Sequence, residues 1–292
     1  MACAGRGYTA GMKWRRGVGK RWIEDRRGRG GGSGGLPIPM GVGGGIGGLV
    51  LLVVIVGVVL LGGGLPGGGG GEPSGGADSA DRESQFVGFV AEDVQDAWTQ
   101  AFAEAGREYE PTSVVIFEQA TTTDGCGPAS SSTGPFYCPA DRKVYLDLGF
   151  FQELRNRFGA PGNFAQAYVV AHEYAHHVQN LTGISDEVRR LQGENPDEAN
   201  ELSIRLELQA DCLAGVWGNS AAEEDLLVPG DLEKGLDAAA AIGDDRIQRE
   251  TTGRVDRESW THGSSEQRVR WFRRGFESGD VQACNTFGGE VL

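Results

Sequence analysis

Three of the four histidines in this chain lie close together, in a pattern that can hold a metal ion. Residues 172–176 read His-Glu-Tyr-Ala-His. On a helix, positions i and i+4 project from the same face, so His172 and His176 would both reach one tetrahedral Zn²⁺ at about 2.0–2.1 Å. Glu173 would lie beside the metal without binding it, placed to take a proton from a metal-activated water. Two ordinary helix-surface histidines are the alternative, but in so histidine-poor a chain the pattern favours one catalytic zinc ion.

A second predicted helix offers a third ligand, which an open catalytic zinc site needs. Glu207 and Asp211 are again four residues apart, with apolar neighbours on the same face, so both carboxylates would lie toward the core. Because an unpaired buried carboxylate is costly, a metal ion and an imidazole N–H are natural partners for them. We expect Glu207 to bind zinc and Asp211 to accept a hydrogen bond from a ligand histidine. The alternative is that Glu207 pairs with Arg205 or another exposed charge.

Helices must position these residues, and the apolar spacing predicts them. The helix with the histidines would begin after Pro161-Gly162 and end at Gly183, and the next would have Asp197 as its N-cap. Helices and strands are segregated rather than alternating, which predicts an α+β fold with a small sheet. Helices are predicted over 87–107, 150–157, 163–181, 197–218, 231–250 and 264–277, and strands over 113–117 and 143–148.

Several separated motifs resemble those of the neutral zinc metallopeptidases of the bacterial YpfJ type. The resemblance covers residues 81–287 and implies a zincin-like, gluzincin-like domain. It also implies that His172, His176 and Glu207 bind zinc and that Glu173 is the general base. Ala175 stands where members of the family have glycine, and the resemblance names no substrate. The motifs are CGPASSSTGPFYCPADRKVYLDLGFF (126–151), HEYAHHVQN (172–180), RLELQADCLAGVW (205–217) and THGSSEQRVRWFRRGF (261–276).

The reaction predicted from these residues is hydrolysis of a peptide bond. The oxyanion of the tetrahedral intermediate needs a hydrogen-bond donor. His262 is the candidate for this catalytic role; the alternative is that it only caps its loop. His177 is rotated about 100° from His176 along the helix, so we expect a supporting or packing role. In zincins an edge strand before the metal helix binds the substrate backbone, and the strand over 143–148 is the candidate. An ordinary core strand is the alternative.

Two other functions stay open at this point. The chain could be an envelope interaction protein with a structural or vestigial zinc, because a structural site usually has four protein ligands. His177 or His262 bound to the metal would favour that reading. The chain could also hydrolyse a different amide, such as a cell-wall cross-link, with the same zinc and glutamate.

The charge is distributed unevenly along the chain. The 292 residues include 27 Lys and Arg against 41 Asp and Glu, for a net charge of −14. Nine basic and two acidic residues fall in 1–40, so the remainder is strongly acidic and would be repelled by phosphate, which argues against nucleic acid as a partner. Residues 41–62 are apolar and uncharged, long enough to predict a transmembrane helix. The basic flank places the N-terminus in the cytoplasm.

This pattern predicts a single-pass membrane protein with an extracytoplasmic catalytic domain. The predicted parts are a basic Gly/Arg-rich cytoplasmic tail (1–40), a transmembrane helix (41–62), a Gly-rich linker (63–80) and a zinc metallopeptidase domain (81–292). A cleaved signal peptide is the alternative, but the long basic region and the lack of a small-x-small site favour an anchor. The expected partners are the membrane and a peptide or protein substrate.

Four of the five cysteines lie in the predicted domain. Cys126 and Cys138 bracket a Gly/Ser/Pro-rich loop, and Cys212 would pair with Cys284, which leaves Cys3 alone. Outside the cytoplasm two such disulfides would stabilise the domain. A cysteine-rich zinc site is the alternative, but no CxxC spacing exists.

Overall fold

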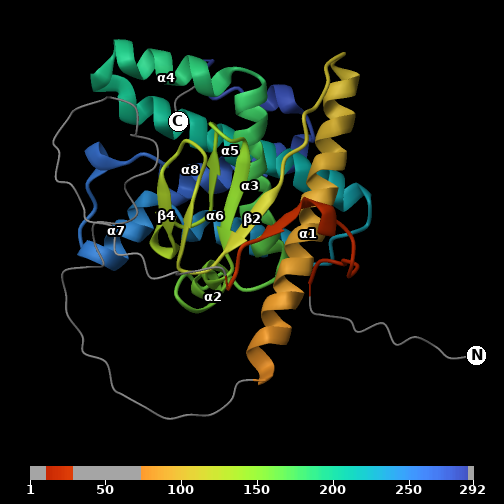
Figure 1. Cartoon of the computed structure of the whole chain (residues 1–292). Coiled ribbons are helices and arrows are strands. Elements are labelled where there is room, and N and C mark those ends of the chain that lie inside the picture. Colours follow the sequence, from red (N-terminus) through yellow and green to blue (C-terminus); the bar gives the residue numbers. More distant parts are fainter. Residues whose placement is uncertain (1–10, 29–73, 289–292) are drawn as a thin grey trace, which may run out of the picture.

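The computed structural model describes residues 11–28 and 74–288, and they form a helix-rich α+β fold with two small sheets (Figure 1). The helices are α1 (Ser74–Glu104), α2 (Gly149–Asn156), α3 (Asn163–Leu181), α4 (Ile184–Glu194), α5 (Ala199–Glu223), α6 (Asp231–Ala241), α7 (Asp244–Thr252) and α8 (Ser265–Ser278). The strands are β1 (Ile23–Asp25), β2 (Val114–Phe117), β3 (Ala120–Thr122), β4 (Pro128–Ser130), β5 (Phe136–Cys138) and β6 (Lys143–Asp147).

The larger sheet has the strand order β1-β2-β6-β5. The first three strands are parallel and β5 is antiparallel to β6. The strand predicted over 143–148 is therefore not an edge strand, because β6 is paired on both sides. Its backbone has no free edge for a substrate strand, so that part of the prediction is wrong. The outer strands β1 and β5 are only three residues long, too short for a periodic pattern in the sequence.

Helix α3 lies at the centre of the fold, with α1, α5 and α6 packed around it (Figure 1). Its bounds match the prediction, since it follows Gly162 and ends just before Gly183, whose φ of 81° breaks the helix. Most of its side chains are buried. The single helix predicted over 231–250 is instead α6 and α7, which separate at Gly243. The backbone of Ser265 packs there so closely that a Cβ would overlap with it.

Residues 11–28, expected to form part of a separate basic tail, belong to the folded unit. β1 pairs with β2 in register Ile23↔Val114, and the N-terminal segment lies against α1 (Figure 1). Trp22 Nε1 donates a hydrogen bond to a Glu92 carboxylate oxygen at 2.7 Å. A Cβ on Gly19 would overlap with the carbonyl oxygen of Gly88 on α1, so the two backbones are in close contact.

The predicted membrane localisation is corrected by these observations. The transmembrane helix predicted over 41–62 lies outside the described residues, and within residues 11–28 and 74–288 no helix is long and apolar enough to span a membrane. Strands β1 and β2 are hydrogen-bonded neighbours, so residues 23–25 and 114–117 lie on one side of any membrane. This pairing disagrees with a single crossing that separates residues 1–40 from residues 81–292. The linker predicted over 63–80 also overlaps α1, which begins at Ser74.

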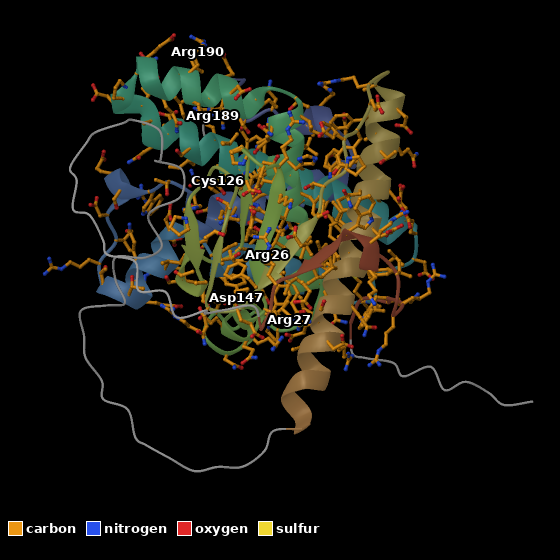
Figure 2. The ribbon with its side chains drawn as sticks, viewed as in Figure 1. Arg26, Arg27, Cys126, Asp147, Arg189 and Arg190 are labelled. Carbon is orange, nitrogen blue, oxygen red and sulfur yellow. A yellow bond between two sulfur atoms is a disulfide. The ribbon has the colours of Figure 1, made fainter. Side chains whose placement is uncertain are left out.

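The two predicted disulfides, Cys126–Cys138 and Cys212–Cys284, are present. The first ties the β3–β4 hairpin to β5. The hairpin is also held by Asp147 at the end of β6, which accepts hydrogen bonds from the backbone N–H of Gln119 at 3.2 Å and from the Ser131 hydroxyl. Arg26 of the N-terminal segment also donates a hydrogen bond to the hairpin, at the Thr122 carbonyl oxygen, and it is labelled with Asp147 and Cys126 in Figure 2.

Helices α5 and α8 cross at two glycines, and this close approach positions the site described below. A Cβ on Gly275 would overlap with the Cys212 carbonyl oxygen, and one on Gly215 with the Phe272 carbonyl oxygen. We expect Gly275→Ala to lower the free energy of unfolding by about 1–3 kcal/mol, because the helices must move apart. Urea denaturation measures this. Gly193→Ala in α4 is the matched control, since nothing lies within 4 Å of its added Cβ, and an unchanged or higher stability is expected there.

Candidate metal centre

The three residues predicted to bind zinc come together where α3 packs against α5. His172 Nε2 lies 3.1 Å from one Glu207 carboxylate oxygen, and His176 Nε2 lies 3.5 Å from the other. Their candidate ligand atoms all lie within 4.8 Å of one another. Ligands on a tetrahedral zinc at about 2.0–2.1 Å are separated by about 3.3–3.4 Å. The observed spacing therefore fits a zinc ion bound by two imidazole nitrogens and one carboxylate oxygen.

His172 turns its other ring nitrogen to Asp211, which lies one helical turn beyond Glu207 on α5. Its Nδ1 lies 3.0 Å from Asp211 Oδ1, so the Nδ1–H donates to the carboxylate and Nε2 keeps its lone pair for a metal. Burial lowers the pKa of His172, but the charge of Asp211 and the hydrogen bonds to Asp211 and Glu207 outweigh it and raise that pKa to about 9. The two carboxylates thus make this position strongly favourable for a cation.

Asp211 is fully buried and is held by two side chains that were not among the predicted site residues. Arg268 on α8 donates to it through Nε at 2.8 Å and through Nη2 at 2.9 Å. The Tyr168 hydroxyl on α3 donates to Oδ1 at 2.5 Å. Burial raises the pKa of Asp211, and the charges of Arg268 and His172 more than reverse this and leave it below its usual range. Asp211 on α5 is therefore a carboxylate held by partners on two other helices, α3 and α8.

When both imidazoles are neutral, as binding to a metal requires, the buried charges of this cluster need an added cation to balance. Glu173, Glu207 and Asp211 are 7%, 7% and 0% exposed, and Arg268, at 2%, is the buried guanidinium beside them. With neutral imidazoles, the three carboxylates and the one guanidinium carry a net charge of −2. Buried charge of this kind is costly unless it is compensated. A divalent ion would neutralise it, which agrees with the donor set.

Glu173 lies beside the candidate ligands without joining them. Burial raises the pKa of its carboxyl group, and the charges of His172 and His176 act in the opposite direction, so these groups lie near one another. Among the described residues, none donates a hydrogen bond to its carboxylate. A buried carboxylate with a raised pKa and no fixed partner is suited to accept a proton.

His262 and His177, the other two histidines, have different surroundings. His262 Nδ1 lies 3.2 Å from Asp244, whose carboxylate also accepts the backbone N–H groups of Thr261, His262 and Gly263. The His262 side chain is 27% exposed, and Glu207 acts on its pKa. His177 is fully buried, with Nδ1 against the Tyr137 hydroxyl at 2.9 Å and Nε2 against the Glu110 carbonyl oxygen at 2.6 Å. It packs away from the cluster.

Four residues that support the site were not predicted from the sequence. Gln179 follows His176 by three positions on the same helix, and its Oε1 lies 2.8 Å from His176 Nδ1. That spacing could have identified it. Tyr168 lies four positions before His172, again on one face. Arg268 and Asp244 come from helices far along the chain, so only the folded structure shows their contribution.

A helix-rich α+β fold whose central helix carries a histidine pair next to a buried glutamate defines a protein with a site suited to one zinc ion. Comparison with known proteins agrees. The chain matches the family described as "Putative neutral zinc metallopeptidase" over residues 12–287, and it belongs to that family. The resemblance predicted from the motifs is thereby confirmed, and the match includes most of the N-terminal segment that packs on α1.

Two relatives illustrate the similarity. The chain is 44% identical over 281 residues to "Uncharacterized protein YpfJ" of Escherichia coli (strain K12), which covers 92% of this chain and 96% of that protein. It is 51% identical over 179 residues to "Uncharacterized protein Rv2575" of Mycobacterium tuberculosis (strain ATCC 25618 / H37Rv), covering 58% of this chain and 60% of that protein. No solved structure matches the chain.

Proposed function

We propose that this chain is a zinc-dependent peptidase in which His172, His176 and Glu207 bind the metal. The observation that carries the proposal is a set of three candidate ligand atoms within 4.8 Å of one another, next to the buried Glu173, to whose carboxylate none of the described residues donates a hydrogen bond. Membership of the zinc metallopeptidase family supports the same activity.

The chemistry divides between the metal and the residues of the chain. A bound zinc supplies a Lewis acid for the peptide carbonyl and a water whose pKa is lowered toward neutrality. With zinc bound, Glu173 would accept a proton from the attacking water and pass it to the leaving amine. Asp211 holds the Nδ1–H of His172, which keeps the imidazole in the tautomer that presents Nε2 to the metal.

His262 is proposed as the donor to the developing oxyanion. Asp244 holds its Nδ1, which leaves Nε2 to face a substrate. Burial lowers the pKa of His262, whereas its hydrogen bond to the Asp244 carboxylate and the charge of Glu207 raise that pKa above its usual range. A partly exposed imidazole of this kind can donate an Nε2–H to a negatively charged oxygen.

The number of ligands favours a catalytic over a structural zinc. Within residues 11–28 and 74–288, the cluster contains three candidate ligand residues, whereas structural sites usually have four. His177 does not offer a fourth ligand, because its ring nitrogens bond to Tyr137 and to the Glu110 carbonyl oxygen, outside the cluster. A site with three protein ligands leaves a position for water and substrate.

Metal removal tests the proposal. We expect the zinc-loaded full chain to cleave members of a mixed peptide pool, a chelator to abolish cleavage, and one equivalent of Zn²⁺ to restore it. Mass spectrometry of the pool reports the cleavage. Mg²⁺ is the control for re-addition, since it prefers six oxygen ligands and should not restore activity. A chain that holds one zinc and cleaves no peptide would contradict the proposed activity.

A further inference from the structure

The second candidate ligand histidine, His176, is held by a row of two side-chain amides, those of Gln179 and Gln209. His176 Nδ1 lies 2.8 Å from Gln179 Oε1. Gln179 Nε2 donates to Gln209 Oε1 at 3.0 Å and to the Leu206 carbonyl oxygen at 2.7 Å. Gln209 Nε2 in turn donates to the Cys284 carbonyl oxygen at 3.2 Å. Gln179 is 0% and Gln209 7% exposed, so these groups have little water to replace a lost partner.

The two backbone carbonyls fix the direction of every hydrogen bond in this row. A carbonyl oxygen only accepts, so the Gln209 amide must turn its NH₂ to Cys284 and its oxygen to Gln179. Gln179 then turns its NH₂ to Gln209 and Leu206, which leaves its oxygen facing His176. That oxygen can only accept, so the proton of His176 lies on Nδ1. Nε2, the atom nearest Glu207, therefore keeps its lone pair.

The far end of the row is anchored by covalent and polar contacts to α5. Cys284 closes the short 3₁₀ helix Val281–Cys284 and is joined to Cys212 on α5 by a disulfide. The following Thr286 is fully buried; its hydroxyl donates to the Arg205 carbonyl oxygen at 2.7 Å, and its own carbonyl oxygen accepts from Arg205 at 2.5 Å. The carbonyl of Cys284 is thus held at a fixed position relative to Gln209.

We propose that Gln179 is the positioning residue of His176 and that the Cys212–Cys284 disulfide supports it through Gln209. The row sets the tautomer and the ring orientation of this ligand, as Asp211 does for His172. The disulfide therefore contributes to zinc affinity as well as to stability. The inference rests on the proposed zinc site, but it does not depend on which bond the protein hydrolyses.

A pair of substitutions at one position separates positioning from packing. Gln179→Met and Gln179→Glu both lose the N–H donors to Leu206 and Gln209, but only the glutamate keeps an oxygen that accepts from His176. We expect Gln179→Met to raise the zinc Kd by about 10–100-fold, and Gln179→Glu to keep it within about threefold of the unchanged chain, by the same reasoning. Competition with a chromophoric chelator measures Kd, and thermal unfolding of the metal-free proteins reports folding. Equal Kd values for the two variants, or no change in either, would overturn the proposal.

The disulfide is tested with the second disulfide as its control. Cys212→Ala/Cys284→Ala should raise the zinc Kd by about 10-fold, while Cys126→Ala/Cys138→Ala, in the separate hydrophobic cluster beneath the β3–β4 hairpin, should leave it unchanged. If the first variant does not fold, Gln209→Met breaks the row with the disulfide intact, and the same rise is expected. Equal zinc affinity in all these variants would refute the role of the disulfide. A chain that binds zinc but cleaves no peptide would contradict only the proposed function, whereas a chain that binds no zinc would contradict both.

Discussion

Glu173→Gln is expected to lower kcat for peptide hydrolysis by about 10²–10⁴-fold, the usual contribution of a positioned general base. The amide has nearly the same shape as the carboxylate but cannot accept a proton from water. The pKa of Glu173 is raised by burial and none of the described residues donates to its carboxylate, so no neighbour is placed to take over its role. Zinc content should stay at one equivalent, because the residue is not among the three candidate ligands.

Glu153→Gln provides a control for this change, since the same substitution is made at an exposed position on α2. Its kcat should equal that of the unchanged chain. Equal rates in the Glu173 and Glu153 variants would mean that Glu173 is not the base. A loss of zinc from the Glu173 variant would instead place that carboxylate on the metal and require a different assignment of Glu207.

The parts of the site that sequence analysis could predict are those encoded within one helix. The i, i+4 pairs His172/His176 and Glu207/Asp211 each share a helix face, so their spacing predicted that they could act together. The cost of burying unpaired carboxylates also predicted that these two faces meet and that a ligand histidine donates a hydrogen bond to Asp211. His172 Nδ1 makes this contact. Arg268 could not be found this way. Its pairing with Asp211 depends on the close crossing of α5 and α8, which two glycines permit and no local pattern records.

The fold likewise has elements that the local sequence predicts and elements that depend on contacts between distant segments. Helix α3 lies between two glycines with positive φ, Gly162 and Gly183, so its bounds were predictable. Strands β1 and β5 are three residues long and exist because β2 and β6 offer them hydrogen bonds. The basic, glycine-rich composition of the N-terminus predicts a tail. Its two tryptophans and Ile23 pack against the main core only in the folded chain.

Asp211→Asn is expected to lower the free energy of unfolding of the metal-free protein by about 3–5 kcal/mol, the cost of leaving a buried charge unpaired. Arg268 is 2% exposed, and both of its hydrogen bonds to Asp211 would lose their charged acceptor. Arg268→Met should cost a similar amount because it leaves the carboxylate without its counter-ion. The double variant should lose less than the sum of the two, by about 1–3 kcal/mol, since it removes both charges. Urea denaturation in the presence of a chelator measures all three.

An exposed ion pair serves as the control that tests whether burial causes the expected loss of stability. Arg190 pairs with Glu187 on α4 and projects from the outer surface of the molecule (Figure 2), where both side chains are more than half exposed. Glu187→Gln should leave the unfolding midpoint unchanged, because water solvates each charge once its partner is gone. A loss of less than about 1 kcal/mol for Asp211→Asn, comparable to an exposed pair, would show that water reaches Arg268. Asp211 would then hold His172 without help from α8, and the crossing of α5 and α8 would not determine the geometry of the zinc ligands.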